Sequence, residues 1–136
     1  MGPAWAPLAQ EMTVDDEHPL SPAEAEAVAA VIAADRRRTT DRIDALEREH
    51  AAIVASTEGS PPDDEHDPEG ATIGFERAQV GALLAHARAH LSDLERARHA
   101  LESGTYGTCA RCGGAIPLER LLARPTATTC AACPAG

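Results

Sequence analysis

The longest stretch of this sequence without glycine or proline runs over residues 23–58. A chain segment of this kind favours helix, because alanine, glutamate and arginine recur along it and all have high helix propensity. Ser21, Pro22 and Glu24 form a start signal, since serine caps a helix, proline suits its first position and glutamate closes a capping box. We therefore expect one helix over residues 22–57, about 54 Å long.

A second helix is predicted over residues 68–103, between the Asp67-Pro68 cap and Gly104. Both helices carry apolar residues at spacings of three and four, the pattern of a helical seam. In the first helix these are Ile32, Ile43, Leu46 and Ile53, with Arg36, Thr39 and His50 between them, and in the second Ile73, Val80, Leu84, Ala87, Leu91, Leu94 and Leu101.

Two helices of equal length with a short connection predict an antiparallel hairpin and an all-α fold. Residues 59–62, which read Gly-Ser-Pro-Pro, break the first helix and place an acidic loop at the hairpin tip. We predict a disordered N-terminal arm over residues 1–20, a coiled-coil hairpin over 21–103 with its tip loop at 58–67, and a small four-cysteine domain with a short helix over 104–136.

The chain is acidic, with a formal net charge of −10, and it contains no lysine. Such a surface repels nucleic acid, because affinity for nucleic acid comes mostly from neutralised phosphates. A basic protein partner, or a basic pore in one, suits it better. We expect no sequence-specific DNA binding, no membrane span and no secretory leader, and therefore a cytoplasmic protein.

All four cysteines lie in two Cys-x-x-Cys pairs near the C-terminus, Cys109 with Cys112 and Cys130 with Cys133, separated by 17 residues. Close pairs of this type, each forming a tight turn, are typical of a tetrahedral all-cysteine zinc site. Four protein ligands leave no open position, so we predict one structural Zn²⁺. Two disulfides, four free thiols, or a redox switch that releases zinc are the alternatives.

The segment "GTYGTCARCGGAIPLERLLARPTATTCAAC", residues 104–133, resembles the zinc finger of the DksA/TraR family of bacterial transcription regulators. The shared features are the Gly-Thr-Tyr-Gly lead, both cysteine pairs at their separation, the helix start at Ile116-Pro117, and the run Ala123 to Ala127. With the predicted hairpin, the resemblance covers residues 21–134. It implies a protein that binds the RNA polymerase core, with its hairpin in the secondary channel and acidic tip residues near the active centre.

The tip residues that this resemblance assigns are acidic: Asp63, Asp64, Asp67 and Glu69. The best-known family members carry Asp-x-x-Asp-x-Ala there, whereas this chain has Glu69 in place of the alanine. Gap-free counting from Cys109 instead aligns His66, Glu69 and Ala71. Arg124 matches an arginine that contacts the nucleotide effector ppGpp in some members, but their partner lysines are missing, so we do not expect ppGpp to bind there.

From composition alone, a solvated acidic loop explains the tip as well as a functional one does. His86 and His90 are spaced to form a metal pair, but without a third ligand a solvated face is the better interpretation. We expect no enzyme, because the sequence has no open metal position, no phosphate-binding loop and no nucleophile–base pair. The alternative function is a redox- or zinc-responsive protein-interaction module.

Overall fold

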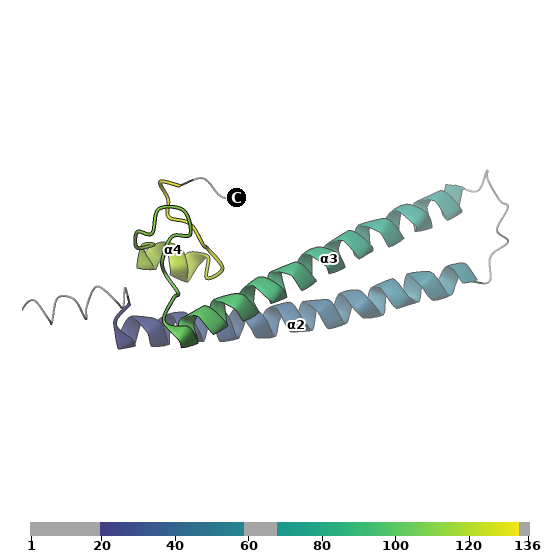
Figure 1. Cartoon of the computed structure of the whole chain (residues 1–136). Coiled ribbons are helices and arrows are strands. Elements are labelled where there is room, and N and C mark those ends of the chain that lie inside the picture. The colour runs from purple at the N-terminus through teal and green to yellow at the C-terminus, as the bar shows by residue number, and fades with distance from the viewer. Residues whose placement is uncertain (1–19, 59–67, 134–136) are drawn as a thin grey trace, which may run out of the picture. The chain divides into compact units, whose positions relative to one another are not determined.

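The computed structural model describes residues 20–58 and 68–133, and the all-α prediction is confirmed. The described elements are two long helices, α2 (Pro22–Glu58) and α3 (Pro68–Ser103), and the short helix α4 (Leu118–Ala123), shown in Figure 1. No helix in these two ranges is both long enough and apolar enough to span a bilayer. The predicted arm, up to residue 19, and the loop over residues 59–67 lie outside the described residues.

Local chemistry sets the helix ends where the sequence predicts them. At the start of α2 the backbone N–H of Ser21 donates to Glu24 Oε1 at 2.9 Å, and the backbone N–H of Glu24 donates to Ser21 Oγ at 3.1 Å. This is the reciprocal capping box. At the end of α3, Gly104 has a φ of 82°, a left-handed conformation that glycine adopts without strain.

Contacts divide the chain into two compact units, which we call the finger unit and the hairpin unit. The finger unit contains the described residues up to Ala34 together with those from Leu94 onward, and the hairpin unit is Asp35–Asp93. The two long helices contact each other within each unit. Residues early in α2 meet residues late in α3, so the helices are antiparallel.

The hairpin unit has a narrow apolar core. Its buried residues are Ile43, Leu46, Val80, Leu84 and Ala87, with Ile53 and Leu91 packed against them. All seven belong to the seams predicted from the sequence. Arg88 and Glu47 form an interhelical ion pair at 2.8 Å near this core.

A set of polar side chains around the Asp35 carboxylate also joins the two helices of the hairpin unit. His90 Nε2 lies 3.1 Å from Asp35 Oδ2, and the buried Thr39 hydroxyl donates to Asp35 Oδ1 at 3.4 Å. Arg38 Nη2 lies 3.6 Å from the same carboxylate. The described part of the chain contains no buried side-chain nitrogen or oxygen without a hydrogen-bond partner.

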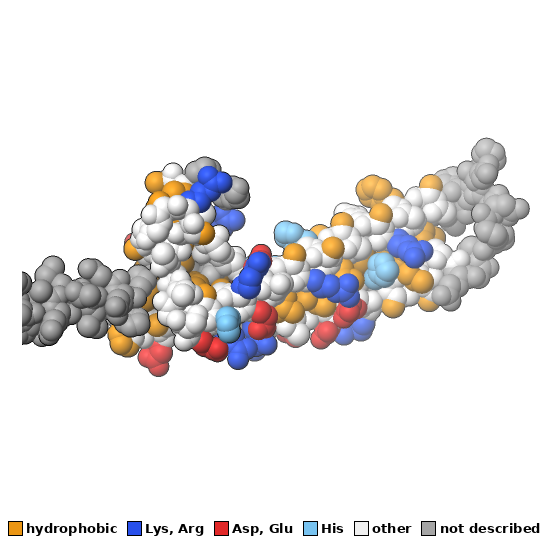
Figure 2. Space-filling model, in the orientation of Figure 1, with side chains coloured by type: hydrophobic (Ala, Val, Ile, Leu, Met, Phe, Trp, Pro, Cys, Tyr) orange, Lys and Arg blue, Asp and Glu red, His pale blue; other side chains and the backbone are white. Residues whose placement is uncertain are grey.

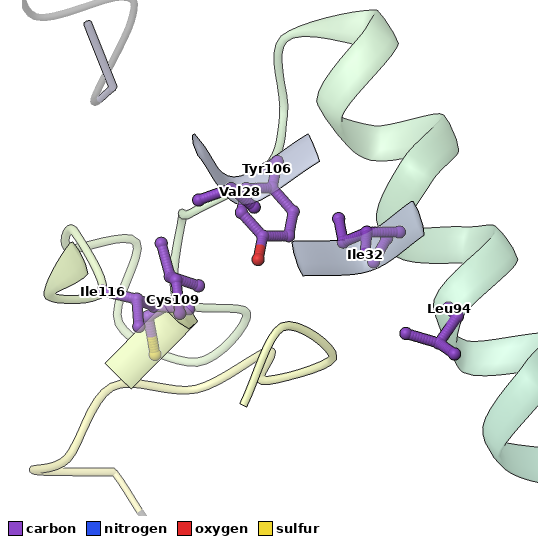
Figure 3. Close-up of a cluster of buried hydrophobic side chains, with 8 residues drawn as sticks. Val28, Ile32, Leu94, Tyr106, Cys109 and Ile116 are labelled. Carbon is purple, nitrogen blue, oxygen red and sulfur yellow. The ribbon is translucent and has the colours of Figure 1, made fainter. Parts of the chain in front are cut away.

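The finger unit is built around a second cluster that joins the long helices to the C-terminal segment. Its buried members are Val28, Ile32, Leu94, Ala97, Tyr106, Cys109, Ile116 and Leu121 (Figure 3). Val28, which is fully buried, was not among the predicted seam residues. Because Cys109 and Ile116 belong to this cluster, the cysteine segment is packed on helix residues of its own unit.

Candidate metal centre

The first cysteine pair lies on a tight backbone turn. The N–H of Cys109 donates to the carbonyl of Gly114 at 2.7 Å, and the N–H of Gly113 donates to the carbonyl of Cys109 at 3.0 Å. Gly113 has a φ of 74°, which a side chain there would strain. A bridge between Thr108 and Ala115 closes the turn. The turn brings the sulfur atoms of Cys109 and Cys112 close together.

The second pair is held against the first by the segment around α4. The N–H of Ala110 donates to the carbonyl of Thr128 at 2.8 Å, and Arg120 Nε donates to the carbonyl of Thr129 at 3.0 Å. The N–H of Cys133 donates to the carbonyl of Cys130 at 3.2 Å, so this pair also forms a turn. Leu121 is fully buried and anchors α4 in the core of the finger unit.

The four cysteine sulfurs form one cluster, as the sequence predicts, and all lie within 4.8 Å of one another. The Sγ atoms of Cys112 and Cys130 are 3.7 Å apart. Tetrahedral zinc with Zn–S bonds of about 2.3 Å requires sulfurs about 3.8 Å apart. The cluster therefore has the dimensions of a four-thiolate zinc site.

The protonation of the cluster also fits a divalent cation. Backbone N–H groups of Cys112 and Cys130 lower the pKa of Cys109 to about 6, which favours its thiolate. The pKa of Cys133 is raised to about 12, first by its hydrogen bond to Cys130 and then by those to Cys109 and Cys112. When four sulfurs lie this close together, one thiol keeps its proton, because another negative charge there would be repelled. A bound metal ion supplies the positive charge that allows all four to be thiolates.

Access to the site is uneven. Cys109 is 2 % exposed, Cys130 and Cys133 are half-buried, and Cys112 is exposed. Four cysteines satisfy a tetrahedral ion completely and leave no position for a substrate. The arrangement can hold the C-terminal loops together, and it offers no catalytic chemistry at the metal.

Comparisons with known proteins agree with this geometry. Residues 104–135 match the family described as the prokaryotic dksA/traR C4-type zinc finger. The chain therefore carries a zinc finger of the DksA/TraR C4 family, as the sequence resemblance indicated, and its four clustered cysteines imply one structural Zn²⁺.

Similarity extends beyond the finger. The chain is similar to the structure of transcription factor DksA2 from Pseudomonas aeruginosa, with 27 % identity, a TM-score of 0.68, and coverage of 81 % of this chain and 79 % of that one. Among curated proteins it resembles uncharacterized protein YteA of Bacillus subtilis, at 50 % identity over 68 residues. Uncharacterized protein YlyA of the same organism is 39 % identical over 51 residues. These matches span 28 % of YteA and 41 % of YlyA, less than half of either.

The structure describes only some of the other predicted site residues. Asp63, Asp64, His66 and Asp67 lie outside the described residues, and Glu69 lies in the first turn of α3 with its side chain not described. Arg124 follows α4 and is exposed. His90 does not pair with His86 but contacts Asp35 of α2. Residue spacing within α3 does not reveal this contact, because Asp35 lies on the other helix.

Proposed function

We propose that this protein is a transcription regulator that binds RNA polymerase directly. The observation that carries the proposal is the match in fold to a transcription factor over 81 % of the chain, together with the dksA/traR-type finger. In this proposal the helical hairpin enters the secondary channel of the polymerase core. The zinc ion holds the finger together and takes no part in a reaction, so the protein acts without being an enzyme.

The charge of the chain supports a protein partner over DNA. With a net charge of −10 and no lysine, the chain repels the phosphate backbone and suits a basic channel. We propose that it works in the cytoplasm without binding duplex DNA on its own.

The proposed acting residues are the tip acids Asp63, Asp64, Asp67 and Glu69. Placed near the catalytic magnesium ions, their carboxylates would alter the local field and the stability of promoter complexes. We assign no effector role to Arg124, because the lysines expected to share ppGpp with it are absent from the sequence.

The test is a binding assay with purified polymerase core and a transcription assay with purified components. The zinc-loaded protein should bind the core, show no retention on duplex DNA, and change the lifetime of promoter complexes. Asp64→Ala combined with Asp67→Ala should abolish the effect on lifetime and leave the affinity within about twofold. The matched control is Asp41→Ala with Asp44→Ala, two exposed acids on α2, which should leave both readouts unchanged.

The two parts of the proposal fail separately. If the protein does not bind the core, direct binding is wrong. If it binds and promoter-complex lifetimes stay the same, the regulatory role is wrong. If the α2 control pair has the same effect as the tip pair, the activity comes from overall charge rather than from the tip.

A second candidate function, a redox- or zinc-responsive interaction module, is favoured by one observation. Cys112 is exposed and its sulfur lies 3.7 Å from that of Cys130. Hydrogen peroxide could oxidise these two thiolates to a disulfide, with the peroxide reduced to water and zinc released. A low dose of peroxide should then release zinc and change partner binding. Zinc that stays bound until the protein unfolds would exclude this function.

A further inference from the structure

The zinc-finger segment, residues 104–133, contains three arginines that differ in exposure. Arg111 and Arg124 are exposed, whereas Arg120 is half-buried. Figure 2 shows basic side chains at the surface of this segment. A charged side chain is rarely buried without a partner that compensates for its lost hydration. The partner of Arg120 is a neutral group, because its Nε donates to the backbone carbonyl of Thr129 at 3.0 Å.

This contact reaches the peptide group that carries a zinc ligand. Thr129 immediately precedes Cys130, and its carbonyl belongs to the planar peptide unit that ends at the Cys130 Cα atom. Fixing the carbonyl oxygen therefore restricts the direction in which the Cys130 side chain leaves the backbone. Thr129 is buried, which limits the access of water to this hydrogen bond.

Arg120 is itself held in place by α4. Its backbone N–H donates to the carbonyl of Pro117 at 3.0 Å, and the N–H of Leu121 donates to the same carbonyl at 3.1 Å. The fully buried Leu121 side chain fixes this turn in the core of the finger unit. The guanidinium thus projects from a rigid element, as a group that orients a metal ligand must.

Other hydrogen bonds to the second half of the finger act further from the ligand. The N–H of Ala110 donates to the carbonyl of Thr128 at 2.8 Å, one peptide unit before that of Cys130. The Tyr106 hydroxyl donates to the carbonyl of Pro125, which is earlier still in the chain. Of these three contacts, the one from Arg120 reaches the peptide unit that Cys130 shares.

The charge of Arg120 also suits the zinc centre. Four thiolates around one Zn²⁺ carry a net negative charge, which hydrogen bonds and neighbouring positive groups stabilise. A guanidinium is positively charged and presents its N–H donors in a planar fork. A lysine ammonium supplies the same charge without that geometry, so the two contributions can be separated by substitution.

We propose that Arg120 is a positioning residue of the zinc centre. It orients Cys130 through the Thr129 carbonyl and supplies part of the positive charge that the four thiolates require, without being a ligand itself. All of these residues belong to the finger unit. The inference is independent of the function proposed above, because it concerns how the metal is held and not what the protein binds.

Zinc affinity of the full-length protein gives the first test, measured by competition with a chromophoric chelator. Arg120→Met should weaken zinc binding by about 10- to 100-fold, the usual effect of removing a group that orients a metal ligand. Arg120→Lys keeps the charge and should fall between Arg120→Met and the unmodified protein. Arg124→Met removes an exposed charge from the same segment and should change the affinity by less than about twofold.

Alkylation of the zinc-loaded proteins separates positioning from a general loss of stability. Mass spectrometry after a limited dose of N-ethylmaleimide measures the rate at Cys130 relative to the rate at the buried Cys109. In Arg120→Met this ratio should rise about tenfold, because the second pair is loosened while the turn of the first pair stays intact. Tyr106→Phe weakens the finger as a whole, so its ratio should stay within about twofold of the unmodified protein.

Several results would overturn the inference. An unchanged ratio in Arg120→Met, with faster alkylation at all four cysteines, would mean that Arg120 only stabilises the fold. An equal loss of affinity in Arg124→Met would mean that any lost positive charge acts on the site. Arg120→Lys with the affinity and ratio of the unmodified protein would leave no role for the bond to Thr129. If Arg120→Met does not bind zinc, the ratio in Arg120→Lys alone decides between these outcomes.

Discussion

The hydroxyl of Tyr106 connects the two halves of the finger, because it donates a buried hydrogen bond of 2.9 Å to the carbonyl of Pro125. We expect Tyr106→Phe to keep the ring packing and leave this carbonyl unpaired. The free energy of unfolding should fall by about 1–3 kcal/mol, the range for a buried polar group that loses its partner. Urea denaturation of the zinc-loaded protein measures this.

The control for that experiment is Ser103→Ala. The Ser103 hydroxyl donates to the carbonyls of His99 and Ala100, but the residue is exposed and water can replace it. Its loss should change stability by less than about 0.5 kcal/mol. Equal losses for the two variants would contradict a special role for the buried bond.

Burial also makes Tyr106 sensitive to alkali. Desolvation raises the pKa of its phenol from 10.0 to about 12. Above pH 10 the unfolded chain loses this proton and the folded chain keeps it, so stability falls as pH rises from 10 to 12. Stability below pH 10 is unaffected. The chain has one tyrosine and no lysine, so Tyr106→Phe should visibly flatten this decline in urea titrations. An unchanged slope would show that the phenol ionises freely in the folded protein.

Some residue roles follow from sequence and others do not. Cys-x-x-Cys spacing predicts a sulfur cluster because each turn is local. The Pro125 carbonyl that accepts from Tyr106 is 19 residues away from it, and this contact depends on how the loops fold over the cluster. Asp35 and His90 are 55 residues apart, and their contact depends on helix register.

The two long helices join through Asp35 and His90 in a partly exposed polar contact of 3.1 Å. Removing one partner leaves the other desolvated, so Asp35→Leu and His90→Leu should each lower the free energy of unfolding by about 1 kcal/mol. The double variant removes both members of the contact, so its loss should be smaller than the sum of the two single losses, with a remainder because the buried Thr39 hydroxyl also loses Asp35 as its acceptor. Thermal and urea unfolding of all four proteins form the cycle. Strictly additive losses would mean that the two side chains do not act together.

Gly81 lies in α3, where a Cβ would meet nothing within 4 Å. Gly81→Ala should therefore raise the free energy of unfolding by about 0.5–1 kcal/mol, through helix propensity alone. Ala82→Gly, next to it, should lower stability by a similar amount. Urea denaturation measures the change. A lower stability of Gly81→Ala would mean that the added methyl group clashes with neighbouring atoms, contrary to the free space around this position.

Helix positions were predictable because their signals are local. The expected helices at 22–57 and 68–103 agree within one residue with Pro22–Glu58 and Pro68–Ser103, since a capping box and Gly104 define their ends. Burial was predicted less completely. Val28 is fully buried because the finger folds onto it, which the spacing of residues in α2 alone does not indicate.

At the scale of the whole molecule, stability is divided between two apolar clusters. The finger cluster contains Cys109 and is packed by Cys130 and Cys133, whereas the hairpin cluster contains no residue of the zinc finger. The roles of the acidic tip were predicted from a resemblance alone, and those side chains lie outside the described residues, so they stay predictions.

Zinc removal should therefore affect the two units differently. Without the ion, the four sulfurs lose the charge that holds them together, and the loops from Thr105 to Cys133 lose their cross-link. Chelation should abolish hydrogen-exchange protection at Tyr106, Ile116 and Leu121. Protection near Leu46 and Leu84 should persist because their cluster lies within the hairpin unit. Adding zinc back should restore the finger signals. Simultaneous loss at all sites would show that the metal supports the whole chain as one cooperative unit, and unchanged protection at Ile116 would show that the finger folds without zinc.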